Sequence, residues 1–311
     1  MKYFSKLFFL LAGLFLIMTS LRSVKSIKPA AALKETTVSP FSETRGISNK
    51  TRSGMRGKTT TGISSETTEI RESLGKYYEK NKVKGSFVLY DQKNNKYIIY
   101  NQPDITKALI PASTFKICNS LIALETGVVK DEHVTFKWDG KNRQRPEWNA
   151  DTDMKLAFKN STVWYYQEIA RKIGEVRMKE WLEKAKYGNA DTGGGIDGFW
   201  LWGKLRITPM QQIDFLKRLH DNKLPFSQRS MDLVKEIMIA RDTSGYVLRA
   251  KTGGGKQDDQ YIGWYVGYVT INDNVYYFSN CIQSENGGAD FLDTRTAITF
   301  DILNELNIIK K

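Results

Sequence analysis

The stretch Pro111-Ala-Ser-Thr-Phe-Lys-Ile-Cys-Asn-Ser-Leu-Ile-Ala-Leu124 decides the predicted fold of this chain of 311 residues. Within it, Ser113 and Lys116 have the S-x-x-K spacing, one helical turn apart, and the apolar run Ile117–Leu124 follows. We expect a helix that begins at this point, presents the serine hydroxyl at its N-terminus and favours negative charge there through its dipole. Ser113 is therefore the predicted nucleophile.

Lysine stands here where many serine hydrolases have histidine. The two histidines, His133 and His220, lie in polar, surface-like contexts, so we interpret both as structural residues. Lysine can act as a base only if burial lowers its pKa, and each pKa unit requires about 1.4 kcal/mol of differential stabilisation. We expect the apolar neighbours Phe115, Val163 and Trp200 to supply that environment.

Strand-like segments flank a helical middle. Two expected hairpins combine residues 85–90 with 97–100 and residues 261–270 with 275–282. From Ser113 to about Ile239 apolar residues recur at helical spacing, strand character returns after Lys251, and an amphipathic helix is expected over 289–308. Strands at both ends around a helical insertion predict an α+β fold: an antiparallel β-sheet flanked by helices, with a mostly helical subdomain inserted.

The first residues have the composition of an export signal. Lys2 and Lys6 are followed by an apolar run over residues 7–18 and then by small and polar residues. We interpret residues 1–26 as a secretory signal peptide; an uncleaved anchor is the alternative, although the apolar run is short for a membrane span. Both interpretations predict an exported, periplasmic protein, and signal removal would leave it without stable membrane insertion.

The rest of the chain divides into two parts. Residues 27–68 are rich in Ser, Thr, Gly and Lys and lack an apolar period, which predicts a disordered basic tether. Residues 69–311 form the predicted catalytic domain. With 41% hydrophobic residues, the chain can bury a full core.

Charge and cysteine content exclude several classes of function. The net charge is +13, but lysines and arginines are scattered and no basic block is interleaved with aromatics, so we expect no nucleic-acid partner. No His, Cys and carboxylate cluster has metal-ligand spacing, so no metal is expected. We interpret Cys118 and Cys281 as buried thiols, while a disulfide stays possible because sequence gives no Cα separation.

Five motifs together resemble those of the class D (oxacillinase-type) serine β-lactamases. They are Ser113-Thr-Phe-Lys116, Ser161-Thr-Val163, Tyr187-Gly-Asn189, Phe199-Trp-Leu201 and Lys251-Thr-Gly253. The resemblance covers roughly Gly85 to Leu306. It implies the fold of serine β-lactamases and penicillin-binding transpeptidases, and hydrolysis of β-lactam antibiotics through an acyl-enzyme on Ser113, which gives antibiotic resistance.

The resemblance also implies a modified base. In class D enzymes the lysine that matches Lys116 is N6-carboxylysine, formed reversibly with carbon dioxide or bicarbonate; no other cofactor is implied. Addition requires a neutral amine, and the carbamate is an oxygen base for Ser113 and for the hydrolytic water. Trp200 matches the tryptophan whose indole N–H holds the carbamate, and core packing is its alternative interpretation.

Further roles follow from the same resemblance. Ser161 would relay a proton between Lys116 and Lys251 to the leaving β-lactam nitrogen, and Val163 would wall the carbamate pocket. Ser161 and Thr162 would also serve as an N-cap of the next helix. Lys251-Thr-Gly253 would lie on an edge strand beside the nucleophile, with Lys251 and Thr252 engaging the substrate carboxylate.

Glycines and an arginine complete the expected site. Gly253, Gly254 and Gly255 let the backbone approach a ligand closely. The N–H groups of Ser113 and Gly254 would form the oxyanion hole. Arg295 aligns with the arginine opposite the substrate carboxylate, or alternatively forms an ion pair on a helix surface.

Two rival functions share part of the motif set. A β-lactam sensor domain would be acylated without rapid turnover, and so would a penicillin-binding transpeptidase; the Ser-Thr-Val, Tyr-Gly-Asn and Phe-Trp-Leu motifs argue against the transpeptidase. Trp202 stands where many relatives have an acidic residue, and Gly254-Gly255 replaces a bulkier pattern. Because of these departures, the preferred β-lactams and the oligomeric state are not predicted.

Overall fold

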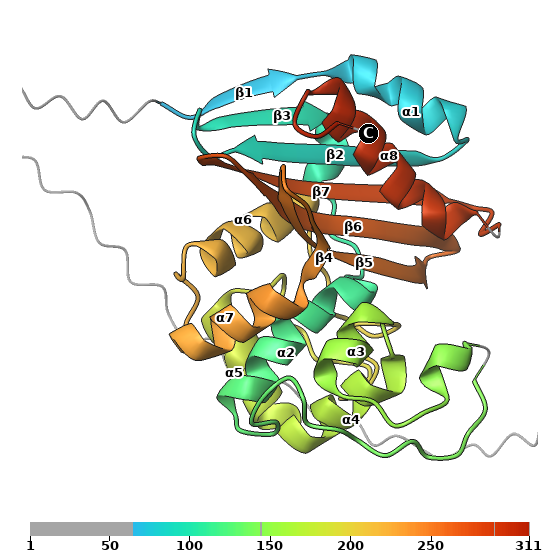
Figure 1. Cartoon of the computed structure of the whole chain (residues 1–311). Coiled ribbons are helices and arrows are strands. Elements are labelled where there is room, and N and C mark those ends of the chain that lie inside the picture. Colours follow the sequence, from blue (N-terminus) through green and yellow to red (C-terminus); the bar gives the residue numbers. More distant parts are fainter. Residues whose placement is uncertain (1–64, 144, 289, 311) are drawn as a thin grey trace, which may run out of the picture. The chain divides into compact units, whose positions relative to one another are not determined.

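The computed structural model describes residues 65–143, 145–288 and 290–310, so the predicted signal peptide and most of the predicted tether lie outside the described residues. The strands form one sheet in the order β1-β3-β2-β7-β6-β5-β4 (Figure 1). In chain order they are β1 Thr67–Ile70, β2 Lys84–Asp91, β3 Lys96–Tyr100, β4 Ile239–Asp242, β5 Val247–Gln257, β6 Gln260–Ile271 and β7 Asn274–Ser284.

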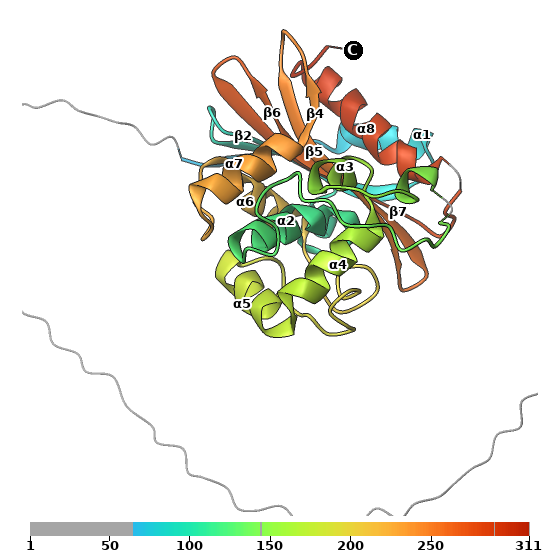
Figure 2. The same ribbon diagram turned by 60° about the horizontal axis from the view of Figure 1, so that its bottom comes forward.

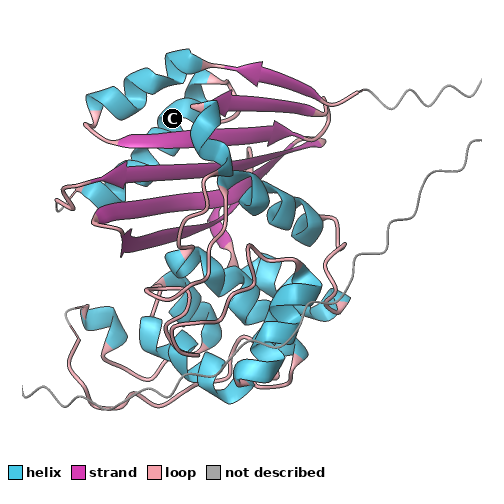
Figure 3. Cartoon of the chain, turned by 180° about the vertical axis from the view of Figure 1, so that it is seen from behind, coloured by secondary structure: helices cyan, strands magenta, loops and turns pink. Residues whose placement is uncertain are grey.

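Helices cover the sheet and fill the middle of the chain. The α-helices are α1 Gly75–Lys80, α2 Lys116–Glu125, α3 Met154–Lys159, α4 Val163–Ile173, α5 Glu175–Ala185, α6 Pro209–His220, α7 Gln228–Ile237 and α8 Phe291–Glu305. Short 3₁₀ helices are η1 Glu72–Leu74, η2 Gln102–Thr106, η3 Ala112–Phe115 and η4 Pro146–Trp148. Seen from behind in Figure 3, the sheet and the group of helices α2 to α5 form separate layers.

Both faces of the sheet are buried, and the residue pattern of the strands explains why. Side chains alternate between faces along a strand. In β2, Phe87 and Leu89 join the core under α1 and α8, whereas Val88 and Tyr90 join the core shared with the helical layer. The central strands β2, β7 and β6 are therefore buried at nearly every position, as expected for a sheet between two helical layers.

The structure confirms the predicted fold class and both hairpins. β2 pairs antiparallel with β3, and β6 with β7. The expected sheet was wrong at two places. It was expected to be antiparallel, but β1 pairs in parallel with β3. Strand structure was expected to return after Lys251, but β4 begins at Ile239 and β5 at Val247. β4 has only four residues, and three of them are exposed, so its sequence carries little of the apolar alternation that marks a strand.

β4 corrects one expectation about the edge of the sheet. β5 is not the edge strand along its whole length, because Val247–Arg249 pairs with β4. The last backbone hydrogen bond on that side runs from Ala250 N–H to Met238 O at 2.9 Å. Beyond it, Lys251-Thr-Gly253 borders the active-site cleft, by which we mean the space between η3, the Ser161 turn and this part of β5; β5 contacts η3, as expected.

Other expectations concern cysteines, metals and membranes. Cys118 on α2 and Cys281 on β7 are buried free thiols, which confirms that interpretation. Within residues 65–143, 145–288 and 290–310, no group of three or more His, Cys, Asp or Glu side chains is arranged to hold a metal. Over the same residues, no helix combines the length and apolarity that crossing a bilayer requires.

Candidate active site

The predicted nucleophile and its lysine meet at the junction of η3 and α2. Ser113 lies within η3, Lys116 begins α2, and Lys116 Nζ lies 2.7 Å from Ser113 Oγ. Ser113 is 9% exposed, and Lys116 is completely buried. The S-x-x-K spacing thus brings the two groups into hydrogen-bond contact through one turn of helix.

The turn before the nucleophile is strained and tightly held. Ala112 has φ +47°, a left-handed conformation that costs a non-glycine residue about 1–3 kcal/mol. The neighbouring contacts hold it in place: Ala112 N–H donates to Trp200 O at 3.0 Å, and Thr114 Oγ1 donates to Pro111 O at 2.7 Å. A Cβ on Gly253 would lie 2.9 Å from Pro111 O, so β5 approaches this turn as closely as only glycine allows.

Lys116 is buried without a counter-charge. In the described part of the chain no carboxylate pairs with it, and burial lowers its pKa well below the usual value, with further repulsion from Lys251 and Arg145. The ring of Tyr166 lies 5.3 Å from Nζ. An amine in these surroundings favours its neutral form, the form that a base or a carbon dioxide acceptor requires.

An aromatic group packs around Phe115, the residue before this lysine. The ring of Phe115 contacts Trp200, Phe199 and Tyr187 at centroid distances of 5.3, 5.1 and 5.5 Å. The indole N–H of Trp200 is buried and has no hydrogen-bond partner. Buried donors are rarely left unpaired, so this N–H is available for a partner that the described residues do not supply.

The second serine lies in the turn between α3 and α4. Ser161 has φ +56°, and Thr162 N–H donates to Ala157 O at 2.8 Å, which closes the turn. Thr162 is the N-cap residue of α4, but its side chain makes no capping hydrogen bond. Val163, the first residue of α4, is partly exposed. The predicted side-chain cap is therefore absent from this helix, which leaves the hydroxyl of Ser161 for other partners.

Lys251 connects this turn with β5. It is 4% exposed, and its Nζ donates to Ser161 Oγ at 3.2 Å and lies 5.4 Å from the centroid of the Phe158 ring. Burial lowers the pKa of Lys251 to about 7, and Arg295 and Arg145 add like-charge repulsion. Both lysines of the site therefore lose their charge at a lower pH than an exposed lysine does.

Arg295 on α8 approaches β5 from the other side. Its Nη1 donates to Gly253 O at 2.7 Å, and its Nε is buried without a partner. Desolvation lowers its pKa to about 10 although Asp293 opposes that shift. A Cβ on Gly254 would lie 3.2 Å from Arg295 Nη1. These contacts place the Arg295 guanidinium against the Gly253-Gly254 segment of β5.

The Tyr-Gly-Asn motif connects the loop of residues 187–189 with the segment of residues 204–206. Asn189 accepts from Arg206 N–H at 2.9 Å and donates to Lys204 O at 3.0 Å, which ties two loops together. Gly188 has φ +53°, and a Cβ there would lie 2.1 Å from Arg206 O. The motif also contacts η3, which contains the nucleophile, because the ring of Tyr187 packs on Phe115.

Sequence reasoning missed Arg145, Trp148 and Phe158. Arg145 is exposed and lies 5.4 Å over the ring of Trp148, and its charge acts on Lys116 and Lys251. Trp148 Nε1 donates to Asn160 O at 3.0 Å, so its loop is fixed beside the Ser161 turn. The Glu147-Trp148 neighbourhood carries no motif, and only the position of Phe158, three residues before Ser161, could have suggested proximity to the site.

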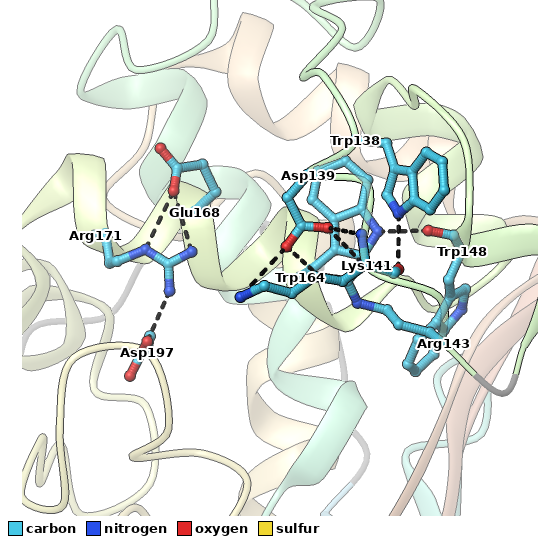
Figure 4. Close-up of polar contacts among 9 residues, drawn as sticks. All are labelled: Trp138, Asp139, Lys141, Arg143, Trp148, Trp164, Glu168, Arg171 and Asp197. Atoms are coloured by element: carbon cyan, nitrogen blue, oxygen red, sulfur yellow. Dashed lines mark hydrogen bonds and ion pairs between the residues drawn. The ribbon is translucent and has the colours of Figure 1, made fainter.

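A second gathering of charges borders a different cavity, and we call it the surface ion-pair cluster. It borders a cavity of about 440 Å³ and consists of Asp139, Lys141, Arg143, Glu168, Arg171 and Lys172. Figure 4 shows Arg171 between Glu168 and Asp197, and Arg143 and Lys141 at Asp139. Every cation of this cluster has a carboxylate partner. The cluster therefore has the character of a solvated structural surface.

Comparison with known proteins agrees with the fold and the motif set. Residues 85–304 match the model of the penicillin-binding protein transpeptidase domain. The chain is 43% identical over 238 residues to β-lactamase OXA-48 of Klebsiella pneumoniae, a match that covers 76% of this chain and 89% of that protein.

Solved structures give the same result. A class D β-lactamase from Sebaldella termitidis is 39% identical, with a TM-score of 0.77, over 79% of this chain and 100% of that one. The C-terminal domain of the Bacillus licheniformis BlaR penicillin receptor is 33% identical, with a TM-score of 0.74, over 79% of this chain and 99% of that domain. The fold therefore serves both an enzyme and a receptor.

Proposed function

Because this chain belongs to the class D serine β-lactamases, we propose that it hydrolyses β-lactam antibiotics through an acyl-enzyme on Ser113. One observation carries the proposal: Lys116 is buried without a carboxylate partner among the described residues, and its Nζ lies 2.7 Å from Ser113 Oγ. A serine hydroxyl becomes an effective nucleophile when an adjacent base removes its proton.

We further propose that Lys116 carries a carboxyl group derived from carbon dioxide. When bound, this group supplies an oxygen base. The residues present fit it: burial favours the neutral amine of Lys116, and the unpartnered N–H of Trp200 is a donor for a carboxyl oxygen. Val163, beside the Ser161 turn, would close the pocket toward solvent.

The remaining residues have roles that follow from their contacts. Ser161 Oγ, 3.2 Å from Lys251 Nζ, is suited to pass a proton to the nitrogen that leaves when the lactam opens. The N–H groups of Ser113 and Gly254 are the proposed oxyanion donors, each typically worth about 10²–10³ in rate. Lys251, Thr252 and Arg295 supply positive charge and hydrogen bonds for the substrate carboxylate.

A β-lactam receptor is the second candidate, and the similarity to the BlaR penicillin receptor supports it. A receptor would also be acylated on Ser113 but would keep the acyl group. The two functions therefore differ in deacylation, not in recognition of the β-lactam.

The test follows hydrolysis of a chromogenic β-lactam by the purified protein, with and without added bicarbonate. Sustained turnover that rises with bicarbonate supports the carboxylated enzyme. A single stoichiometric burst, with the mass of the acyl group left on Ser113, would instead identify a receptor.

Export is part of the same proposal. A β-lactamase acts where β-lactams reach the cell wall, and the predicted signal peptide of residues 1–26 would take it there. The domain boundary at residue 69 is likewise a proposal; β1 begins at Thr67. N-terminal sequencing of the protein from the cell envelope would locate the mature end.

A further inference from the structure

A groove of about 830 Å³ continues from the cleft past Lys251 and Thr252. Its walls come from α3 on one side and from the joint between α7 and β4 on the other. The groove lies where the edge of β5 becomes open, because pairing between β4 and β5 ends at Arg249 and the last backbone hydrogen bond on this side is made by Ala250 N–H. Figure 2 shows α3 and α7 close to the end of the sheet that β4 and β5 form.

The groove is apolar inside and electrically balanced at its rim. Leu156 on the α3 wall is 44% exposed, and Phe158 and Met238, which are almost fully buried, also line the groove. The rim combines basic and acidic side chains in similar number: His133, Lys155, Lys159, Asp153, Glu236 and Asp242. Such a rim does not select a charged occupant, whereas the interior favours an apolar one.

The proposed function fixes the direction in which a substrate lies. The lactam carbonyl is assigned to Ser113 and Gly254, and the carboxylate to Lys251, Thr252 and Arg295. The substrate therefore runs along β5 from Gly254 toward Thr252 and Lys251, and both of these residues also line the groove. In cephalosporin-type bicyclic β-lactams, the ring carbon next to the carboxylate-bearing carbon carries a variable substituent, whereas the corresponding penicillin ring carries only methyl groups.

We propose that this groove binds a neutral, apolar or aromatic ring substituent next to the substrate carboxylate, and that Leu156 is the main determinant of that preference. The inference rests on the proposed function, since it uses the direction of the bound β-lactam. It adds a specificity site that lies on α3 and the α7–β4 joint, outside the motif set.

The test compares two cephalosporins that share the same acyl side chain. One has a methyl group at the ring position next to the carboxylate-bearing carbon, and the other has an aryl group that is not expelled on ring opening. The ratio of their kcat/KM values, or of their acylation rates followed by protein mass, is measured for the wild-type protein and for Leu156→Ala. We expect the wild-type protein to favour the aryl compound and Leu156→Ala to lower the ratio about tenfold, the lower end of what a methylene group contributes in an apolar pocket.

Val176→Ala is the matched control, because Val176 is 72% exposed on α5 and lies outside the groove. It should leave the ratio unchanged. A ratio that stays the same in Leu156→Ala, in protein that a penicillin still acylates on Ser113, would overturn the groove proposal. If no β-lactam acylates the wild-type protein, the proposed function itself fails, so the two failures are distinguishable.

Discussion

The active-site cleft and the surface ion-pair cluster both gather lysines and arginines, but their surroundings differ. In the cleft, Lys116 and Lys251 are buried, have no carboxylate partner among the described residues, and have lowered pKa values. In the cluster, Arg143 and Arg171 are paired with carboxylates, and the hydrogen bond from Arg143 lowers the pKa of Asp139 to about 2. Positive charge alone therefore does not mark a catalytic site; burial without a counter-charge does.

The largest expected effect is the loss of activity when Lys116 in the cleft is replaced, and Lys141 in the surface ion-pair cluster provides the control. Lys116→Ala should lower kcat/KM by about 10²–10⁴, the usual contribution of a general base, because Ser113 loses its proton acceptor. The variant should acylate slowly and barely deacylate. Lys141→Ala, at a side chain that is 80% exposed, should leave the rate unchanged. Stopped-flow hydrolysis of a chromogenic β-lactam measures both, and rapid turnover by Lys116→Ala would remove Lys116 from the mechanism.

The next comparison uses two tryptophans. Trp200→Phe keeps a buried ring but removes the indole N–H, and a hydrogen bond to a charged group is worth about 1.5–3 kcal/mol, so turnover should fall about 10- to 100-fold. Added bicarbonate should restore part of the rate by mass action. Trp138→Phe removes an N–H that donates to Lys141 O at 3.0 Å in the cluster region, and it should not change the rate. Equal rates in the two variants would contradict a role for the Trp200 N–H.

Local features of the site could be predicted from the sequence, whereas contacts between distant residues could not. The S-x-x-K pair could be predicted because one helical turn fixes the separation of Ser113 and Lys116, and the paired strands could be predicted from their apolar alternation. The contact between Lys251 and Ser161 joins residues ninety positions apart, so the residues alone did not give it and only the family resemblance implied it.

Other features left no trace in the sequence at all. The left-handed turn at Ala112 occurs at a residue that ordinarily avoids it and is held by contacts from Trp200 and Gly253. Arg145 has no motif around it, and β4 is too short and too exposed to show a strand pattern. These features depend on tertiary contacts, which a local pattern does not encode.

A third prediction concerns stability and has a defined sign with pH. The pKa of Lys251 falls from 10.5 to about 7 on folding, so between these values the unfolded chain binds a proton that the folded chain lacks, and stability rises with pH across that window. Burial of the charged lysine is therefore most costly below about pH 7. Lys251→Met should raise the melting temperature at pH 6, by about 2–4 °C for each kcal/mol gained, while it abolishes turnover.

The measurement is calorimetry of the wild-type protein and of Lys251→Met at pH 6 and pH 10. The difference in melting temperature should shrink at the higher pH. A variant that is less stable than the wild-type protein at pH 6 would show that Lys251 is not strained in the folded state.

The smallest effect is expected in the cluster. Arg171→Met breaks the ion pairs with Glu168 and Asp197, but the arginine side chain is 45% exposed, so the free energy of unfolding should fall by at most about 1 kcal/mol. Urea titrations at low salt and at 1 M NaCl should show that salt removes most of this difference. A loss several times larger would mean that the cluster is a structural centre of the helical layer.

The most direct test of the account is a ¹³C NMR spectrum of the protein equilibrated with ¹³C-bicarbonate. The account predicts a carbamate resonance in the wild-type protein that is absent from Lys116→Ala, weakened in Trp200→Phe and unchanged in Lys141→Ala. A wild-type protein that turns over β-lactams at the full rate without any such resonance would contradict the central claim that the buried, unpaired Lys116 works as a carboxylated base.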